Sequence, residues 1–448
     1  MIIPLLPWVL RMRFFRHDIV VLDKILGSLM TKVMTNVTLA LEKYLRDYAE
    51  PEAQSLDLAC SVDEKSYQRC IVIPACDEAP DFLEQFKRPE LMGGCLLILV
   101  VNQADVSVGV LPRNHHLFES VLQSGSVIYR HLTCTLVRTA ACDILLVNRY
   151  QTGSEIPVKQ GVGLARKIGC DLACALFVAK RLTSSWVYST DADAVLPEAY
   201  FRHRVQSESI SAEIFEFHHQ DDGSDVAQAT QLYESAIKYY RQGLAWAGSA
   251  YAVYTLGSTL VFNISAYCQV RGFPKRAGAE DFYLINKLAK ISPLSFNPLI
   301  DVALQSRVSE RVPFGTGPAI KNILELECPG EEYTYYNPQV FIALKQWLHF
   351  LAVDFKKVFF SDNNSIDCLL EQCKSLAPEL LAAAEHIGFN SWLKHLLKQC
   401  RNPESYDKNT HHWFDAFQTL KFIRYLQANY YPPQALKKCL RHAGECFV

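Results

Sequence analysis

The sequence has 448 residues and a formal net charge of −2, with 45 basic and 47 acidic side chains. This balance excludes a global field that would attract nucleic acid, so we expect no nucleic-acid partner. Half of the residues are hydrophobic and 21% are charged, which is ordinary for a soluble globular protein. A chain of this length has room for a large core and two or three structural units.

The N-terminus is apolar for ten residues and then basic, the reverse of the order in a secretory signal. Such a run is too short to span a bilayer, and the apolar runs further along are shorter still. The segment is compatible with an anchor in a membrane interface, and Met30 or Met34 is an alternative start. We therefore expect a cytoplasmic protein that could contact the inner face of a membrane peripherally.

The 15 cysteines are scattered, and no two pairs of them have the spacing of a zinc ribbon. We expect free, buried thiols, as is typical of a reducing cytosol.

Helices and strands alternate along the first two thirds of the chain. Helical spacing at 20–48 precedes a polar linker, and an apolar helix is predicted at 162–181. Continuous apolar runs predict buried strands at 70–75, 95–103, 143–150 and 186–190. Strands without alternation, separated by helices, imply a mostly parallel sheet covered by helices on both faces.

After Pro197 the pattern predicts a further strand at 212–219, a long helix at 232–249 and a helix that opens on acids near 280. From about 331 onward the sequence is helical and rich in aromatic residues. We therefore predict three parts: an N-terminal helical extension (1–65), an α/β domain (66–330) and a helical C-terminal region (331–448).

Three predicted strands end in polar segments, at 74–78, 102–105 and 190–193. Ligands of such sheets bind beyond the carboxyl ends of the strands, so these segments predict one site. Asp191 and Asp193 point to the same side of an extended segment, about 6.6 to 6.8 Å apart. They could share Mg²⁺ or Mn²⁺ and leave positions for diphosphate oxygens. No basic residue is near them in sequence, and the alternative is an ordinary acidic turn.

Glu280 and Asp281 open a predicted helix after a glycine, where the helix dipole favours negative charge. They are either helix-start acids or a general base for an acceptor hydroxyl. Arg166, with Lys159 and Lys167, surrounds the start of another helix that could meet phosphate.

Arg307 and Arg311 precede a segment rich in Gly, Thr and Pro. That segment suits a lid over a diphosphate or an ordinary surface loop. His218 and His219, which end a predicted strand, are more simply interpreted as structural than as metal ligands. We interpret His411 and His412, beside Asp415, as packing of the terminal helices.

Taken in order, these segments resemble a family 2 glycosyltransferase of the A-type fold. "IVIPACDEA" is similar to the first strand and nucleotide loop of that family, and "LLILVVNQAD" takes the place of its second strand. "GLARKIG" is similar to its ARN helix, "STDADAVLP" to its DxD strand, and "AGAED" to its ED motif. The segment "GSTLVFNISAYCQVRGFP" is similar to its acceptor-side segment. The resemblance covers residues 70 to about 320.

The resemblance implies a nucleotide-diphospho-sugar transferase fold and a metal-dependent glycosyltransferase of the hexosyltransferase class. The donor would be a nucleotide sugar, the cofactor Mg²⁺ or Mn²⁺, and the acceptor a glycan, a lipid-linked molecule or a small molecule. Asp191 and Asp193 would hold the metal, with Asp281 as base beside Glu280. The implied donor-nucleotide residues are Pro74, Ala75, Asp77, Glu78, Asn102, Asp105, Arg166, Asp191, Arg307 and Arg311.

The sequence departs from the family at Asn102, where many members have an aspartate that contacts the base. An amide offers a donor as well as acceptors, which leaves uridine and guanosine donors both open. Lys167 and Arg271 are milder departures.

Two other functions compete with this interpretation. "DADAV" also fits the motif of haloacid dehalogenase-type phosphatases, with Asp191 as nucleophile. However, it follows about 120 residues of α/β sequence, and Ala194 replaces the usual glycine. The chain could also bind a nucleotide sugar without catalysis, although it retains all four acids.

Overall fold

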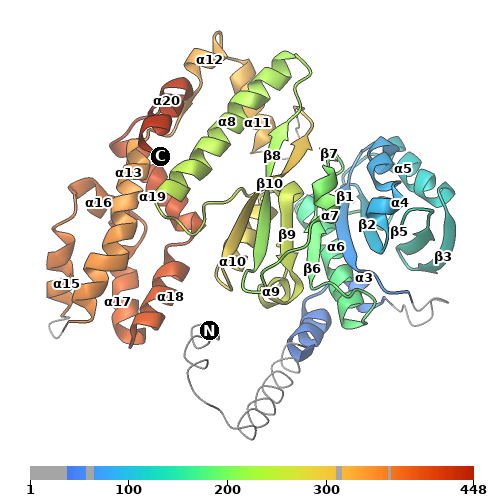
Figure 1. Cartoon of the computed structure of the whole chain (residues 1–448), viewed down its shortest axis with the longest axis horizontal. Coiled ribbons are helices and arrows are strands. Elements are labelled where there is room, and N and C mark those ends of the chain that lie inside the picture. Colours follow the sequence, from blue (N-terminus) through green and yellow to red (C-terminus); the bar gives the residue numbers. More distant parts are fainter. Residues whose placement is uncertain (1–37, 57–64, 309–314, 362–364, 448) are drawn as a thin grey trace, which may run out of the picture.

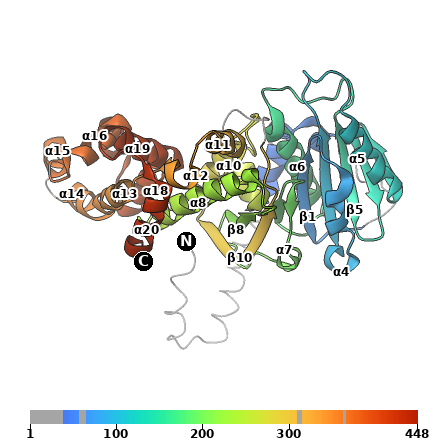
Figure 2. The same ribbon diagram turned by 90° about the horizontal axis from the view of Figure 1, so that it is seen from above.

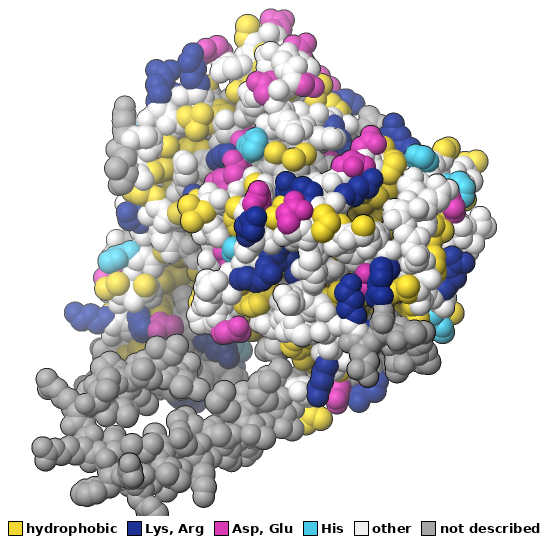
Figure 3. All heavy atoms as spheres, turned by 45° about the vertical axis from the view of Figure 1, so that its right-hand side comes forward, with side chains coloured by type: hydrophobic (Ala, Val, Ile, Leu, Met, Phe, Trp, Pro, Cys, Tyr) yellow, Lys and Arg dark blue, Asp and Glu magenta, His cyan; other side chains and the backbone are white. Residues whose placement is uncertain are grey.

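The computed structural model describes residues 38–56, 65–308, 315–361 and 365–447. Arg311, the apolar N-terminal segment and most of the helical pattern predicted at 20–48 lie outside these residues. Among the described helices, none is both long and apolar enough to cross a membrane. Figure 3 shows acidic and basic side chains interspersed over one face of the molecule, in keeping with the small net charge.

A ten-stranded mixed sheet organises the first part of the chain, in the order β3-β4-β5-β2-β1-β6-β9-β8-β10-β7. Its parallel centre consists of β5 (Asp143–Arg149), β2 (Cys95–Asn102), β1 (Arg69–Ala75) and β6 (Trp186–Ser189). The other strands are β3 (Ser126–His131), β4 (Cys134–Arg138), β7 (Ala194–Val195), β8 (Ala212–His219), β9 (Leu260–Asn263) and β10 (Leu294–Leu304). Only β4, β9 and β7 oppose the remaining seven strands, so most of the sheet runs one way.

The central strands are buried on both faces because helices cover both. Every residue of β1 and β2 is buried, as their continuous apolar sequences predict. Helix α6 (Gly161–Val178) lies close to the sheet at Gly169, where an added Cβ would stand 2.4 Å from Val72. Helix α5 (Pro112–Gln123) lies on the opposite side of the same strands (Figure 2). The sheet therefore presents its strand ends, and not its faces, to a ligand.

The N-terminal helix at 38–47 packs against α6 through a buried polar cluster. The Tyr44 hydroxyl donates to Asp171 Oδ1 at 2.6 Å, and the Tyr267 hydroxyl donates to the same oxygen at 3.0 Å. Lys167 Nζ donates to Asp171 Oδ2 and to the Tyr44 hydroxyl, each at 2.8 Å. Lys167 thus helps to fix this N-terminal helix to α6.

A second hydrophobic core lies in the C-terminal helices (Figure 1). It is rich in aromatic side chains around the fully buried Trp347. Helix α8 (Asp225–Trp246) leaves the sheet and contributes Tyr239 and Leu244 to this core. The same helix contacts β8, so it links the two parts of the molecule.

The remaining helices have between three and 14 residues. Before the C-terminal region they are α3 (Pro51–Gln54), the 3₁₀ helix η2 (Pro80–Phe86), α4 (Pro89–Met92), α7 (Glu198–Arg202), η3 (Gly257–Thr259), α9 (Ile264–Gln269), α10 (Glu280–Leu288), α11 (Thr316–Leu324) and α12 (Pro329–Glu332). The C-terminal region has α13 (Gln339–His349), the π-helix η4 (Phe350–Asp354), α14 (Phe355–Phe359), α15 (Ile366–Cys373), α16 (Pro378–His386), α17 (Phe389–Gln399), α18 (Pro403–Trp413), α19 (Ala416–Asn429) and α20 (Leu436–Cys446). Two short strands, β11 (Thr334–Tyr335) and β12 (Gln434–Ala435), pair with each other.

The α/β class, the mostly parallel direction of the sheet and the helical C-terminal region are confirmed. The segment Pro80–Phe86 is a 3₁₀ helix that begins at a proline. Strand β10 and the elements α5, β3 and β4 had no sequence prediction. The boundaries predicted at 65 and 330 stay predictions.

Candidate functional site

A pocket of about 420 Å³ opens where β1, β2 and β6 end. Its wall combines the ends of these strands with the start of α6 and the residue Arg307, which follows β10. Seven of the predicted site residues line it: Pro74, Glu78, Asn102, Arg166, Asp191, Asp193 and Arg307. The carboxyl ends of the parallel strands thus converge on one hollow, as the topology requires.

Three other predicted residues shape this pocket without lining it. Ala75 is fully buried in β1. Asp77 has a φ of 56°, and its backbone N–H donates to Asn114 Oδ1 at 2.8 Å. Asp105 accepts from the backbone N–H of Val158 at 3.0 Å, which fixes the segment that forms one wall. Their contribution is to the shape of the loop and the wall.

The orientation of Asn102 follows from its hydrogen bonds. Its Nδ2 donates to the carbonyl oxygens of Ala75 at 3.0 Å and Val100 at 3.1 Å. A carbonyl can only accept, so the amide nitrogen must point toward both of them. Both N–H groups of this side chain are thereby used, and Oδ1 is the part left for a ligand. The asparagine therefore presents an acceptor, as an aspartate would.

Arg166 is buried in the wall of the pocket and binds two carboxylates. Its Nη2 lies 2.7 Å from Asp191 Oδ1, and its Nε lies 3.0 Å from Glu280 Oε1. Burial lowers the pKa of Arg166, but Asp191 and Glu280 outweigh it and raise the pKa overall. At Gly257 an added Cβ would stand 2.4 Å from the Arg166 guanidinium, so the guanidinium lies tightly against the backbone.

Arg307 forms a second cluster at the open side of the pocket. Its Nη1 lies 3.1 Å from Glu78 Oε1, and its Nη2 lies 2.7 Å from Asp193 Oδ2. The sequence shows no cation near the DxD aspartates, but the folded chain brings one to each of them, so that part of the sequence argument is wrong. Arg166 and Arg307, both distant in sequence, pair with Asp191 and Asp193.

The donor set at the DxD motif suits a hard divalent ion. Carboxylate oxygens are the protein ligands that Mg²⁺ prefers, and Mn²⁺ accepts them as well. Among the described residues no group of three or more His, Cys, Asp or Glu side chains converges as a metal cage. A metal at Asp191 and Asp193 would thus take its other ligands from diphosphate and water, which is the usual pattern for Mg²⁺.

Asp281 lies beside the Arg166 cluster at the start of α10. Its Oδ2 accepts from the backbone N–H of Gly257 at 3.1 Å, and its Oδ1 accepts from that of Phe282 at 2.7 Å. Burial and the neighbouring Glu280 raise the pKa of Asp281 to about 7, although Arg166 opposes this rise. A carboxyl group with this pKa exchanges protons near neutral pH, as a general base must.

Sequence reasoning missed the wall at Ile156 and Val158, in the segment that follows β5. The same strand-end rule that identified the other segments also applies to β5, and it would have found this one. Gly161, the first residue of α6, also lines the pocket.

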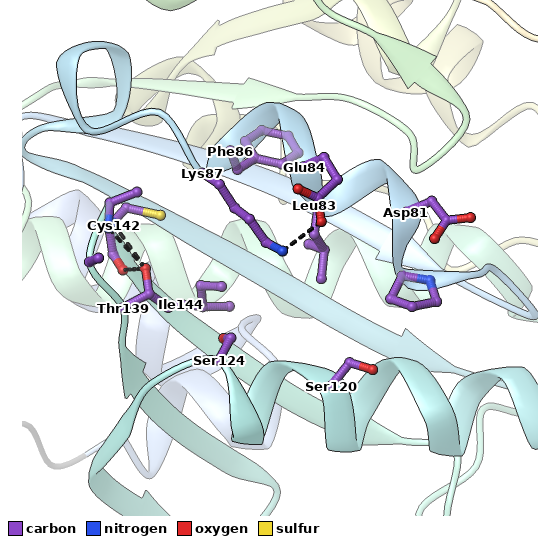
Figure 4. A pocket seen from close by; sticks show the side chains of 13 residues that line it. Asp81, Leu83, Glu84, Phe86, Lys87, Ser120, Ser124, Thr139, Cys142 and Ile144 are labelled. Carbon is purple, nitrogen blue, oxygen red and sulfur yellow. Dashed lines mark hydrogen bonds and ion pairs between the residues drawn. The ribbon is translucent and has the colours of Figure 1, made fainter.

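A second pocket of about 440 Å³ lies between η2, α5 and the start of β5 (Figure 4). Two of its polar side chains pair with neighbours in the wall: Lys87 Nζ with Glu84 at 2.5 Å, and Thr139 Oγ1 with the Cys142 carbonyl at 2.7 Å. No predicted site residue lines this pocket within the described structure.

No protein-family model matches the sequence. No curated protein matches it either. Among solved structures the chain is similar to the mannosyltransferase PcManGT from Pyrobaculum calidifontis in complex with GDP-Man and Mn²⁺, at 13% identity over 93% of this chain and 90% of that chain, with a TM-score of 0.30. It is also similar to GalNAc-T7 with UDP, GalNAc and Mn²⁺, at 11% identity over 70% of this chain and 55% of that chain, with a TM-score of 0.29. TM-scores this low establish no shared activity.

Proposed function

We propose that the protein is a glycosyltransferase of the family 2 type. It would move a sugar from a nucleotide-diphosphate donor to an acceptor hydroxyl. One observation carries the proposal: seven residues predicted for the donor and metal, from five separate segments, line a single pocket. A phosphate-binding site needs cations beside it. Both arginines of that set pair with an aspartate that would hold the metal, Arg166 with Asp191 and Arg307 with Asp193.

The nucleobase would lie against Asn102. Because this side chain presents only an acceptor, it favours a base with a ring N–H at its pairing edge. Uracil and guanine have such a group, whereas adenine and cytosine present an acceptor there and would leave two acceptors facing each other. We therefore expect uridine or guanosine donors in preference to adenosine or cytidine donors.

Negative charge develops on the diphosphate as the sugar leaves. Arg307 carries a charge on the open side of the pocket and would donate to the phosphate oxygens. Asp191 and Asp193 would hold Mg²⁺ or Mn²⁺, which neutralises diphosphate charge when it is bound. Asp281 would take the proton of the acceptor hydroxyl while the hydroxyl oxygen bonds to the sugar carbon and the diphosphate leaves. General-base catalysis of this kind raises the rate by about 10²- to 10⁴-fold.

The first test is a thermal-shift and transfer assay of the Asp193→Ala variant. Wild-type protein should be stabilised by UDP or GDP only with Mn²⁺ or Mg²⁺, by about 2.7 kcal/mol at 100 times the Kd. The variant should lose the metal-dependent shift and the transfer activity. The control is Asp81→Ala, an exposed aspartate at the other pocket, which should change neither.

Transfer at the wild-type rate by Asp193→Ala would contradict the proposal. Hydrolysis of a simple phosphate ester without any nucleotide would favour the phosphatase alternative. A metal-dependent shift without transfer from any UDP or GDP sugar would favour binding without catalysis.

A further inference from the structure

Helix α10 carries Glu280 and Asp281 at its amino end, but local sequence does little to fix that end. The helix has no side-chain N-cap. The preceding residue, Ala279, has a φ of 58°, a left-handed conformation that costs an alanine about 1–2 kcal/mol. Contacts from other elements must therefore hold the start of α10 in place.

The carboxyl end of α10 is held by the C-terminal region. His411 Nε2 lies 2.8 Å from the carbonyl oxygen of Ala289, and His412 Nε2 lies 3.1 Å from that of Lys290. A carbonyl can only accept, so each imidazole N–H satisfies one of these two carbonyl groups, which directly follow the last residue of α10. The two histidines, which sequence alone assigned to packing, thus also hold the turn at which α10 ends.

Asp415 completes this contact with one carboxylate. Its Oδ2 accepts from Asn286 Nδ2 at 3.0 Å and pairs with Lys290 Nζ at 2.5 Å. Its Oδ1 caps α19 by accepting from two backbone N–H groups of the first turn. Asn286 in turn accepts from the backbone N–H of Ala416 at 3.0 Å. Asn286 and Asp415 are both buried, so these bonds are shielded from water.

We propose that the C-terminal helical region positions the catalytic carboxylate Asp281 through α10, with Asp415 as the positioning residue. The inference rests on the proposed function, because it assumes that Asp281 acts as a base. It gives the C-terminal region a role in the reaction beyond its own packing.

The length of α10 makes this coupling effective. A helix of nine residues is about 13 Å long, so a tilt of about 5° at its carboxyl end moves its amino end by about 1 Å. The bonds from Gly257 to Asp281 and from Arg166 to Glu280 depend on where that amino end lies. A misplacement of about 1 Å at a reacting group costs on the order of 10²-fold in rate.

The test uses two single variants and their combination in the full chain. Asp415→Asn keeps the cap of α19, because asparagine is an equally good N-cap. However, its amide N–H groups then face the donors of Asn286 and Lys290. Asn286→Asp sets two carboxylates against each other. The double variant N286D/D415N restores one carboxylate facing one amide. The new carboxylate stands four residues before Lys290, which lies in the turn directly after α10.

We expect Asp415→Asn to lower kcat of sugar transfer by about 10- to 100-fold with donor KM within about twofold. The double variant should regain most of kcat. Asp407→Asn is the matched control, since Asp407 is an exposed residue of α18 that pairs with Lys356 of α14. Asp407→Asn should leave kcat unchanged.

If Asp415 had a merely structural role, Asp415→Asn would lower the amount of folded protein and would not change kcat separately from KM.

Amide hydrogen exchange over residues 280–284 provides a readout that needs no activity. We expect faster exchange there in Asp415→Asn, and protection restored in the double variant. An unchanged exchange rate would overturn the inference, as would an unchanged kcat in an active enzyme. A wild-type chain without any transfer activity would instead overturn the proposed function, while the exchange measurement still decides whether Asp415 controls the start of α10.

Discussion

Two arginine clusters face the same pocket, and they differ in burial. The Arg166 side chain is 4% exposed and lies between α6, β6 and α10, whereas the Arg307 side chain is 34% exposed and follows β10. Each guanidinium binds two carboxylates. Screening by water makes an exposed ion pair weak, whereas a buried charge without a partner is costly. Arg166 is thus a fixed part of the site, and Arg307 is a counter-ion that a ligand can displace.

The largest expected effect is on the buried cluster. Arg166→Met would leave Asp191, Glu280 and Asp281 without their shared cation. We expect a loss of about 3–5 kcal/mol in the free energy of unfolding, measured by urea denaturation. Arg307→Met is the matched control and should cost less than about 1 kcal/mol. Equal losses in the two variants would contradict the distinction between the clusters.

The next effect concerns the pH dependence that the buried cluster imposes on Asp281. Because burial and Glu280 raise the pKa of this carboxyl to about 7, the base form is lost below that pH. We expect kcat to rise about tenfold from pH 6 to pH 8. Stability changes in the opposite direction: the contribution of Asp281 is present below about pH 4, its unfolded pKa, and is lost as the pH rises through about 7.

Asp281→Asn removes this titration. The wild type should therefore lose free energy of unfolding relative to this variant as the pH rises from 4 to 7. A kcat profile that is flat from pH 6 to pH 8 would show that Asp281 does not serve as the base.

The sequence was sufficient for the central strands and for the residues at their ends. Continuous apolar runs predict β1, β2, β5 and β6, and the strand-end rule brings Glu78, Asn102 and Asp193 to one pocket. Strand β10 had no such signal, because Pro298 interrupts it at an irregularity between Asn297 and Asp301. The exposed strand β3 likewise lacks an apolar pattern.

The partners of the charged residues could not be predicted. Arg307 binds Glu78 across 229 positions of sequence, and no local pattern encodes such a contact. The orientation of Asn102 depends on the carbonyl of Ala75 in the neighbouring strand. Charge pairing of this kind depends on the register and packing of the finished fold, which local patterns do not specify.

The smallest expected effect is at the exposed cluster, and it distinguishes a displaceable counter-ion from a fixed one. Arg307→Gln removes the cation that neutralises Asp193, so Mn²⁺ no longer competes with Arg307 for that carboxylate. We expect Mn²⁺ alone to bind up to about fivefold more tightly, the factor that matches an exposed pair of about 1 kcal/mol. UDP or GDP should bind more weakly in the same variant, because a donor to phosphate is lost. Titration with Mn²⁺ followed by electron paramagnetic resonance, without nucleotide, measures the first change. Weaker Mn²⁺ binding in Arg307→Gln would mean that Arg307 organises the carboxylates for the metal, and the two clusters would then both be framework.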